Sequence, residues 1–274
     1  MAANAAPSPT SKALAPRVAA ALEEQIPQPR CELDHKNGFE LLIATILAAQ
    51  STDRGVNKVT PILFGRYPDA HALAAASRAD VEEIVHPTGF FRSKARAIQE
   101  TSAELVLRHG GEVPTTMAAL CGLRGVARKT ANVVLGTAYG IAEGVIVDVH
   151  GTRVSQRLGL TAHKEPAKIE ADLMTLFPKA SWIALGHRLT LHGRYTCLAR
   201  KPACTQCACE PFCPTAKALM QAAEAGVVSS RKEPGRGNSD LVLTPSTRSA
   251  PRQGTRKLRE PAKKKASKAR KPSR

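Results

Sequence analysis

The chain has 274 residues, of which 43% are hydrophobic, and its formal net charge is +17. This length corresponds to about one or two domains with a sizeable core. No apolar run approaches the ~20 residues of a membrane span, the N-terminus lacks an apolar secretion segment, and seven cysteines without a signal peptide argue against a disulfide framework.

The two ends of the chain differ from the middle in composition. Residues 1–16 are rich in Ala, Pro and Ser and are predicted to be a flexible arm. Residues 229–274 hold 15 basic and three acidic residues and contribute +12 of the net charge. Because this segment has almost no large apolar side chains, it is predicted to be a disordered basic tail. It either strengthens nonspecific binding to polyanions or serves only to keep the chain soluble.

The middle of the chain is predicted to be helix after helix. Asn37 and Glu40 have capping-box spacing and precede a buried helix with the sequence FELLIATILAA. Start and stop signals predict further helices at 51–66, after Ser77, from Ser93 to Gly110, and at 128–139, 149–158, 165–176, 181–192 and 214–226. The one strand-like run, GVIVDV at 144–149, is too short to found a sheet. The predicted fold class is therefore all-α.

Four cysteines follow the spacing C-x6-C-x2-C-x5-C, at Cys197, Cys204, Cys207 and Cys213. Thiolates this close in sequence converge on a shared metal, and the spacing favours an iron–sulfur cluster but leaves zinc or an incidental grouping open. Cys209 is expected to be a non-ligand, because four ligands are already present. Cys31 and Cys121 are isolated in the sequence and are expected to be small buried core residues. Arg200 and Lys201, between the first two ligands, form either a phosphate clamp or an ordinary solvated loop.

The sequence CGLRGVARKTANVVL at 121–135 places a glycine turn before a helix. Amide groups at such a helix N-terminus bind phosphate without side-chain chemistry. Lys129 lies in the first turn, where the helix dipole and nearby cations favour its neutral, nucleophilic form; the alternative is an exposed, phosphate-binding lysine. Asp148 fits a helix N-cap, a role that would also keep it ionised for catalysis. His150 is expected to be structural.

Together these stretches resemble the bacterial endonuclease III family of the helix-hairpin-helix DNA glycosylase superfamily. The matching segments are LLIATILAAQSTD (41–53), TGFFRSKA (88–95), LRGVARKTANVVL (123–135), VDVH (147–150) and HGRYTC (192–197), so the resemblance covers about 17–226. It implies a two-lobed all-α fold. One lobe is a six-helix barrel at 33–142, with the hairpin at about 121–139. The other combines 17–32 with 143–228 and holds a 4Fe–4S cluster in the four cysteines, and DNA lies in the cleft between the lobes.

The resemblance also implies removal of oxidised pyrimidines from double-stranded DNA, by a bacterial, cytoplasmic, nucleoid-associated monomer. The family's nucleophilic lysine matches Lys129, which attacks C1′ of a flipped nucleotide, and its essential aspartate matches Asp148. β-Elimination then breaks the strand, so the implied enzyme is a DNA glycosylase and AP lyase. Gln50 matches the residue that fills the gap in the duplex, and Phe90 matches the intercalating wedge. Further implied DNA contacts are Leu123, Arg124, Gly125, Val126, Ala127, Arg128, Arg200 and Lys201.

Two positions depart from the family's hairpin. Arg124 stands where proline is usual, and Ala127 stands where a second glycine is usual. We expect retained activity with altered DNA affinity. Two other interpretations remain open. One is a mismatch or other-damage glycosylase of the same superfamily, although adenine-mismatch glycosylases usually lack the hairpin lysine. The other is a DNA-binding protein without catalysis, against which Lys129 and Asp148 argue together.

Overall fold

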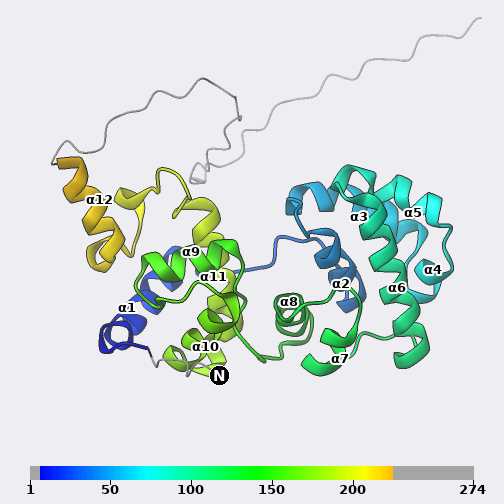
Figure 1. Ribbon diagram of the computed structural model, residues 1–274, viewed down its shortest axis with the longest axis horizontal. Coiled ribbons are helices and arrows are strands. Elements are labelled where there is room, and N and C mark those ends of the chain that lie inside the picture. The colour runs from blue at the N-terminus through cyan, green and yellow to red at the C-terminus, as the bar shows by residue number, and fades with distance from the viewer. Residues whose placement is uncertain (1–6, 225–274) are drawn as a thin grey trace, which may run out of the picture. The chain divides into compact units, whose positions relative to one another are not determined.

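The computed structural model describes residues 7–224, which all belong to one compact unit spanning Met1–Ser229. Within these residues the chain consists of α-helices joined by loops and short 3-10 turns, with no β-strand (Figure 1). The predicted all-α class is confirmed, and the strand-like run is a loop at residues 144–148 that leads into a helix beginning at Val149. The tail predicted at 229–274 lies outside the described residues.

The helices fall into two groups that pack around two hydrophobic cores. The first group is α2 (Gly38–Leu47), α3 (Asp53–Arg66), α4 (Ala70–Ala75), α5 (Arg78–Val85), α6 (Phe91–His109), α7 (Met117–Gly122) and α8 (Arg128–Tyr139). The second is α1 (Pro9–Gln25), α9 (Val149–Arg157), α10 (Pro166–Leu176), α11 (Trp182–Tyr195) and α12 (Pro214–Glu224). Single 3-10 turns cover His86–Thr88, Lys179–Ser181, Cys204–Gln206 and Glu210–Phe212.

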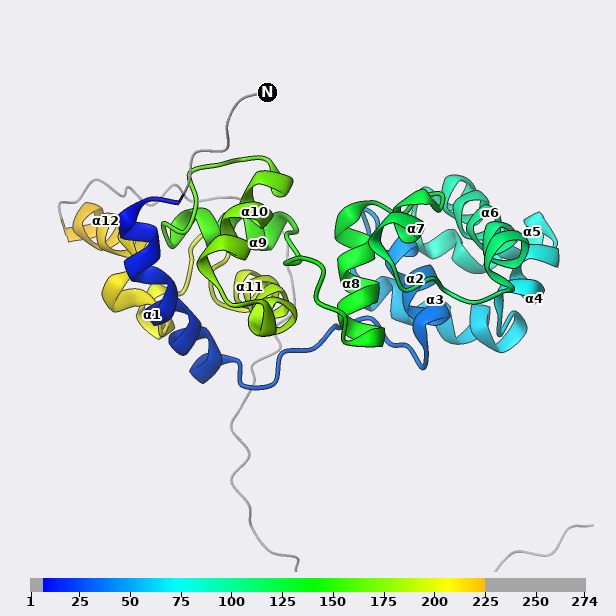
Figure 2. The same cartoon turned by 90° about the horizontal axis from the view of Figure 1, so that it is seen from below.

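Each core draws on a separate part of the chain. The first core runs from Leu33 to Leu135 and includes Ile146. The second contains Ala15 to Leu22 and residues from Val145 to Ala216. Figure 2 shows α8 beside α2 and α7, and these helices are in contact. The domain boundaries given above stay a prediction, and the two cores follow them closely except at Ala15 and Ile146.

Helix capping explains several of the observed starts. The Asn37 side-chain oxygen accepts a hydrogen bond from the Glu40 amide at 2.9 Å, and a Glu40 carboxylate oxygen accepts one from the Lys36 amide at 2.8 Å. The capping box therefore forms, with its return bond one residue earlier than the motif requires. Thr52 caps α3 in the same way. Ser77 precedes α5 as predicted but makes no capping bond through its side chain.

Some predicted boundaries are wrong, and the helix predicted at 181–192 extends to Tyr195 as α11. Residues 9–16, assigned to the flexible arm, are the first half of α1. The Ser8 hydroxyl caps this helix and Pro9 occupies its first turn, where proline costs no hydrogen bond, so the Ala/Pro/Ser composition is compatible with a helix. Helix α6 begins at Phe91 rather than Ser93.

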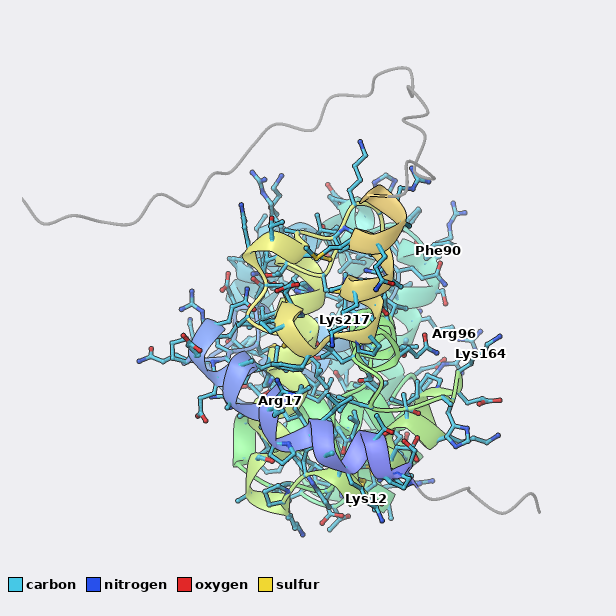
Figure 3. All side chains as sticks on the ribbon, turned by 90° about the vertical axis from the view of Figure 1, so that its left-hand side faces the viewer. Lys12, Arg17, Phe90, Arg96, Lys164 and Lys217 are labelled. Atoms are coloured by element: carbon cyan, nitrogen blue, oxygen red, sulfur yellow. The ribbon has the colours of Figure 1, made fainter. Side chains whose placement is uncertain are left out.

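Helix α1 is held in place by apolar and cationic contacts. Val18 and Leu22 are fully buried in the second core. Figure 3 shows Arg17 on α1. Its guanidinium lies 4.5 Å from the centre of the Phe212 ring, a cation–π contact that joins α1 to the cysteine-rich segment. No helix within residues 7–224 is both long and apolar enough to cross a bilayer.

Candidate active site

Lys129 and Asp148 line the same pocket. The pocket has an empty volume of about 520 Å³ including its open mouth, and we call it the lysine pocket. Its wall comes from five separate stretches: residues 30–33, the end of α2 with Asp53, the start of α8, residues 146–148, and α11. The structure therefore brings together the two residues that the sequence singled out for chemistry.

The backbone before α8 places Lys129 at the mouth of this pocket. Ala127 is the extended N-cap residue, so Lys129 is the second residue of α8 and lies in its first turn. Its side chain is exposed. It makes no hydrogen bond or ion pair within residues 7–224, which leaves its amine available to a ligand. The first amides of α8 have no partner within the helix, as at any helix N-terminus.

Asp148 caps α9, as its sequence context predicted. One carboxylate oxygen accepts hydrogen bonds from the amides of His150 and Gly151, at 2.9 and 2.7 Å. Two amide donors stabilise the charged carboxylate. The second oxygen has no hydrogen-bond partner in the described part of the chain. His150 is half-buried, and its Nδ1 lies 3.2 Å from the Arg153 guanidinium, consistent with the structural role expected for it.

Close packing of α9 on α11 fixes the direction in which Asp148 leaves the backbone. A Cβ atom on Gly193 would lie 2.7 Å from the Cβ of His150. Such a distance is not seen between real side chains, so glycine is required for this contact. The short loop of residues 144–148 is thereby held against α11.

An ionic network forms another wall of the lysine pocket. The Arg194 guanidinium, from α11, pairs with Glu32 and with Asp53, the latter at 2.5 Å. Burial disfavours the charged form of Arg194, but the hydrogen bonds to Asp53 and Glu32 outweigh it, so its pKa is raised. The Tyr195 hydroxyl donates to the same Glu32. The three charged residues lie far apart in the sequence, and nothing in their spacing could have grouped them.

Two further polar groups on α11 line the lysine pocket and were not anticipated. The buried His187 ring lies 3.1 Å from the Thr137 hydroxyl, and desolvation, followed by the nearby Arg194 charge, lowers its pKa. The Thr190 hydroxyl is buried and has no partner in the described residues. It is therefore available to a molecule in the pocket.

Helix α8 is joined to α10 by a second network. The buried Glu170 carboxylate accepts a bond from the Arg128 guanidinium and one from the Asn132 amide, both at 2.8 Å. Gly144 makes room for this network, because a Cβ there would collide with Glu170. The Arg128 guanidinium is directed to Glu170 and braces the helix that carries Lys129, and its contact with DNA stays a prediction.

The hairpin presents backbone rather than side chains. Leu123 and Val126, both predicted to contact DNA, are buried in the first core, so their side chains are not available to a ligand. The Val126 amide donates to the Leu123 carbonyl at 3.2 Å and closes the turn. Gly125 has φ +76°, a conformation that favours glycine. Arg124 is exposed and pairs with Glu100 at 2.6 Å.

Three non-glycine residues within residues 7–224 have a positive φ, and all three were predicted to contact DNA. They are Gln50, Phe90 and Lys201, with φ of 53°, 48° and 50°. Such a conformation is strained for these residue types and tends to persist where function requires it. Gln50 and Lys201 are exposed, as is Arg200, and 67% of the Phe90 side chain is accessible.

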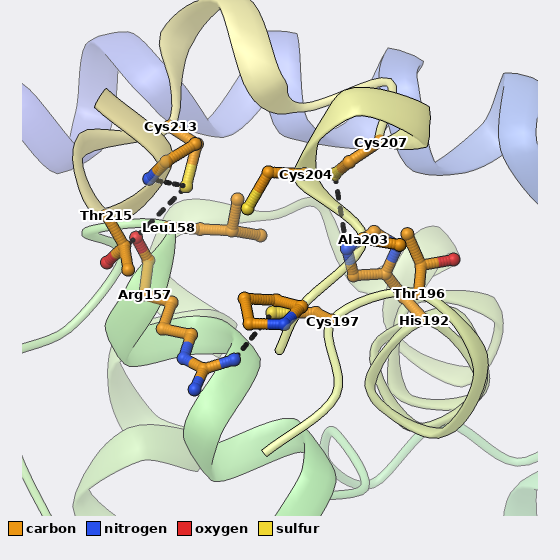
Figure 4. A pocket seen from close by; sticks show the side chains of 12 residues that line it. Arg157, Leu158, His192, Thr196, Cys197, Ala203, Cys204, Cys207, Cys213 and Thr215 are labelled. Carbon is orange, nitrogen blue, oxygen red and sulfur yellow. Dashed lines mark hydrogen bonds between the residues drawn. The ribbon is translucent and has the colours of Figure 1, made fainter. Parts of the chain in front are cut away.

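Cys197, Cys204, Cys207 and Cys213 border one cavity, which we call the cysteine pocket (Figure 4). Three of the four sulfurs have a polar neighbour. The Arg157 guanidinium donates a hydrogen bond to the Cys197 sulfur at 3.4 Å, and the Ala216 amide donates one to the Cys213 sulfur at 3.4 Å. The His192 ring nitrogen lies 3.6 Å from the Cys207 sulfur. No group of three or more His, Cys, Asp or Glu within residues 7–224 is close enough to hold a single metal ion.

The remaining cysteines differ from one another. Cys209 is buried, does not border the cysteine pocket and donates to Cys207. This bond, with a second from His192, lowers the pKa of Cys207. Cys31 is half-buried and lines the lysine pocket, whereas Cys121 is exposed. The expectation that Cys121 is a small buried core residue is therefore wrong, because it lies on the solvent side of the short helix α7.

The loop between the first two cysteines is braced from α9. Arg157 donates to the carbonyls of Leu198 and Ala199 at 2.6 and 2.9 Å. Arg153 donates to the carbonyls of Cys197 and Gly193 at 3.1 and 2.7 Å. Side chains of the protein therefore fix the turn that carries Arg200 and Lys201.

Comparison with known proteins places this site in context. Residues 43–179 match the model of the HhH-GPD superfamily of base excision DNA repair proteins. A curated protein of Synechocystis sp., named endonuclease III, is 52% identical over 197 residues, which are 72% of this chain and 90% of that protein.

Two solved structures are similar in both fold and sequence. One is a non-covalent complex of endonuclease III with DNA, with a TM-score of 0.74 and 40% identity over 77% of this chain and 98% of that one. The other is a trapped covalent intermediate of endonuclease III with DNA, with a TM-score of 0.71 and 40% identity over 75% of this chain and 98% of that one.

Proposed function

The chain belongs to the endonuclease III family within the HhH-GPD superfamily of base excision DNA repair proteins, and we propose that its lysine pocket receives oxidised pyrimidines flipped out of double-stranded DNA. At the level of reaction class, the protein is a DNA glycosylase with AP lyase activity. The observation that carries the proposal is the presence of Lys129 and Asp148 in the lining of one pocket.

Lys129 is the proposed nucleophile. Its neutral amine attacks C1′ of the flipped nucleotide, the bond from C1′ to the base nitrogen breaks, and the base leaves with a proton. The departing base takes up the proton that the attacking amine loses. The sugar ring then opens as O4′ takes up a proton from solvent, which gives an iminium between Lys129 and C1′. The iminium acidifies the C2′ proton, and removal of that proton expels the 3′ phosphate by β-elimination. Water then hydrolyses the product and releases the amine.

Asp148 is the proposed electrostatic partner. Positive charge develops on the sugar as the base leaves, and a fixed carboxylate nearby stabilises that charge. Its two amide donors hold the Asp148 carboxylate oriented before substrate arrives, so it needs little reorganisation during the reaction. The oxygen that takes no bond from described residues is the one free to face the sugar and to carry protons.

The DNA contacts are proposed to be mostly backbone contacts and protruding side chains. The free amides at the start of α8 and the turn at Gly125 fit a phosphate. Gln50 fits the gap left by the flipped nucleotide, and Phe90 fits the adjacent base step. Both side chains are exposed, and both residues have a left-handed backbone conformation. Arg200 and Lys201 fit a second phosphate from the braced loop.

A 4Fe–4S cluster is the proposed occupant of the cysteine pocket. A single zinc ion needs four sulfurs about 2.3 Å from one point, and no set of described residues meets that requirement. Four thiols placed around a cavity fit the corners of a cubic cluster instead. When bound, the cluster would pin the segment from Cys197 to Cys213. It supplies no step of the proposed reaction, which moves no electron.

The remaining features of the proposal concern the setting. We propose that the protein works as a monomer in the bacterial cytoplasm, on the nucleoid. The basic tail, outside the described residues, would raise nonspecific affinity for DNA. The two alternatives, a mismatch glycosylase and a non-catalytic DNA-binding protein, differ from this proposal in which duplexes lose a base.

The test is a lesion panel with matched variants. Wild-type protein is incubated with duplexes carrying thymine glycol, an adenine mismatch or an abasic site, and base release and strand cleavage are measured separately. We expect release of thymine glycol and cleavage at the abasic site, both lost in Lys129→Ala and retained in Lys58→Ala, which removes an exposed lysine from α3. Release only at the mismatch would identify the other glycosylase, and binding without any release would identify a non-catalytic protein.

A further inference from the structure

Gln50 and Phe90 project from two different loops. Gln50 lies between α2 and α3, and Phe90 lies directly before α6. Under the proposed function both enter the duplex at the same lesion, one into the gap and one beside it. Each would then need a defined position relative to the other, although 39 residues of chain separate them.

One buried ammonium group connects the two loops. Lys94, in the first turn of α6, is 5% exposed. Its Nζ donates to the Thr88 carbonyl at 2.7 Å and to the Ser51 hydroxyl at 3.2 Å. Ser51 is the neighbour of Gln50, and Thr88 is two residues before Phe90. The Ser51 hydroxyl also donates to the Thr88 carbonyl, which closes a triangle of hydrogen bonds.

The charge of Lys94 is unusual for a buried group. No acidic side chain within residues 7–224 pairs with it, and burial lowers its pKa. A buried lysine without a carboxylate destabilises the fold unless its donors are used. Both hydrogen bonds of the Lys94 ammonium group go to the two loops, and neither goes to the core. These bonds therefore fix the position of one loop relative to the other.

We propose that Lys94 is a positioning residue that sets Gln50 and Phe90 relative to each other, so that the two side chains enter damaged DNA as a unit. The inference rests on the proposed function. Its consequence is that the contributions of Gln50 and Phe90 to lesion binding are not independent while Lys94 is present, and become independent when it is removed.

The experiment is a double-mutant cycle in two backgrounds. Affinity is measured for a duplex with a tetrahydrofuran abasic analogue opposite 2-aminopurine and for the undamaged duplex, using wild type, Gln50→Ala, Phe90→Ala and the double variant. The same set is repeated with Lys94→Met. With Lys94 present, we expect the loss of affinity in the double variant to differ by about threefold or more from the product of the two single losses. In the Lys94→Met background, we expect the loss in the double variant to equal that product within error.

Fluorescence of the 2-aminopurine supplies an independent readout. Wild type and Lys94→Arg, which keeps a cation and its donors, are expected to unstack the probe, and Lys94→Met is expected to lose most of that signal. Arg108→Met, which removes a charge from the exposed far end of α6, is the matched control and should behave as wild type. If Lys94→Met does not fold, Ser51→Ala, which removes only one corner of the triangle, is expected to weaken the coupling instead.

The outcomes separate the two hypotheses. Unchanged coupling in Lys94→Met, or in Ser51→Ala when only that variant folds, overturns the positioning role while the proposed function stands. A wild type that does not prefer the tetrahydrofuran duplex overturns the proposed function, and this inference falls with it.

Discussion

The lysine pocket and the cysteine pocket are built in opposite ways. The cysteine pocket is lined mostly by residues 192–216, with Arg157 and Leu158 added from α9. The lysine pocket takes residues from five stretches between Arg30 and Arg194. A pocket that must bind a fixed inorganic group can be local, because the ligands are identical and closely spaced. A pocket that must act on a large substrate needs different groups at set angles, which distant elements supply.

The largest expected effect separates the two roles of Asp148. In Asp148→Asn the amide oxygen still caps α9, so the melting temperature should change little, because Asn and Asp are comparable N-caps. Base release should fall by about 10²–10³-fold, because the carboxylate charge is lost. Single-turnover release of thymine glycol measures the first effect and thermal unfolding the second. Unchanged release would mean that Asp148 serves only as a cap.

The cysteine pocket is tested by removing one ligand. Cys204→Ser is expected to lower the iron content from about four atoms per chain and to remove the visible absorbance of an iron–sulfur cluster. Cys121→Ser, which changes an exposed thiol away from this pocket, is the control and should match wild type. Stoichiometric zinc in the wild-type protein, with no iron, would refute the cluster assignment.

A smaller effect is expected where the two groups of helices meet. Glu170→Gln removes the carboxylate charge to which Arg128 and Asn132 both donate. It should lower the free energy of unfolding by only about 1–2 kcal/mol, because the Arg128 side chain is half exposed. Glu104→Gln, which disrupts a surface pair on α6, should cost about 0–1 kcal/mol. Urea unfolding measures both. Equal losses would show that the Glu170 network is no more important than a surface pair.

The smallest expected effect is a pH dependence at His187. Its pKa is lowered from 6.5 in the folded protein, first by burial and then by the Arg194 charge. The unfolded chain therefore binds more protons just below pH 6.5, so this contribution to stability is complete above that pH and is lost as the pH falls. His187→Gln should flatten the decline in melting temperature between pH 7 and about pH 5. An identical decline in both proteins would exclude His187 as its source.

The sequence predicted those parts of the molecule that depend on local signals. Asn37, Thr52 and Gly110 mark helix ends through their own side chains or backbone freedom, and the bounds of α8 follow from the Gly125 turn and Gly140. Spacing likewise grouped the four cysteines. The first half of helix α1 was assigned to the arm, because a segment with Pro9, Pro16 and several Ala and Ser residues has the composition of a loop.

Contacts between distant segments were beyond sequence reasoning. The pairing of Arg194 with Glu32 and Asp53 depends on where the end of α11 lies relative to the start of α3, which no local pattern specifies. The same holds for the ion pair of Arg128 with Glu170 on α10, because the two residues are far apart in the sequence. Lys94 carried no signal at all, because a lysine in the first turn of an amphipathic helix is normally a solvent-exposed residue.

The most direct test of the account is the position of the covalent adduct. The protein is reduced with borohydride while bound to a duplex with an abasic site, digested, and mapped by mass spectrometry. The account predicts a sugar remnant on the Lys129 side chain, and no adduct at that peptide in Lys129→Ala. An adduct on another lysine or on the N-terminal amine, or no adduct in a protein that cleaves the strand, would contradict it.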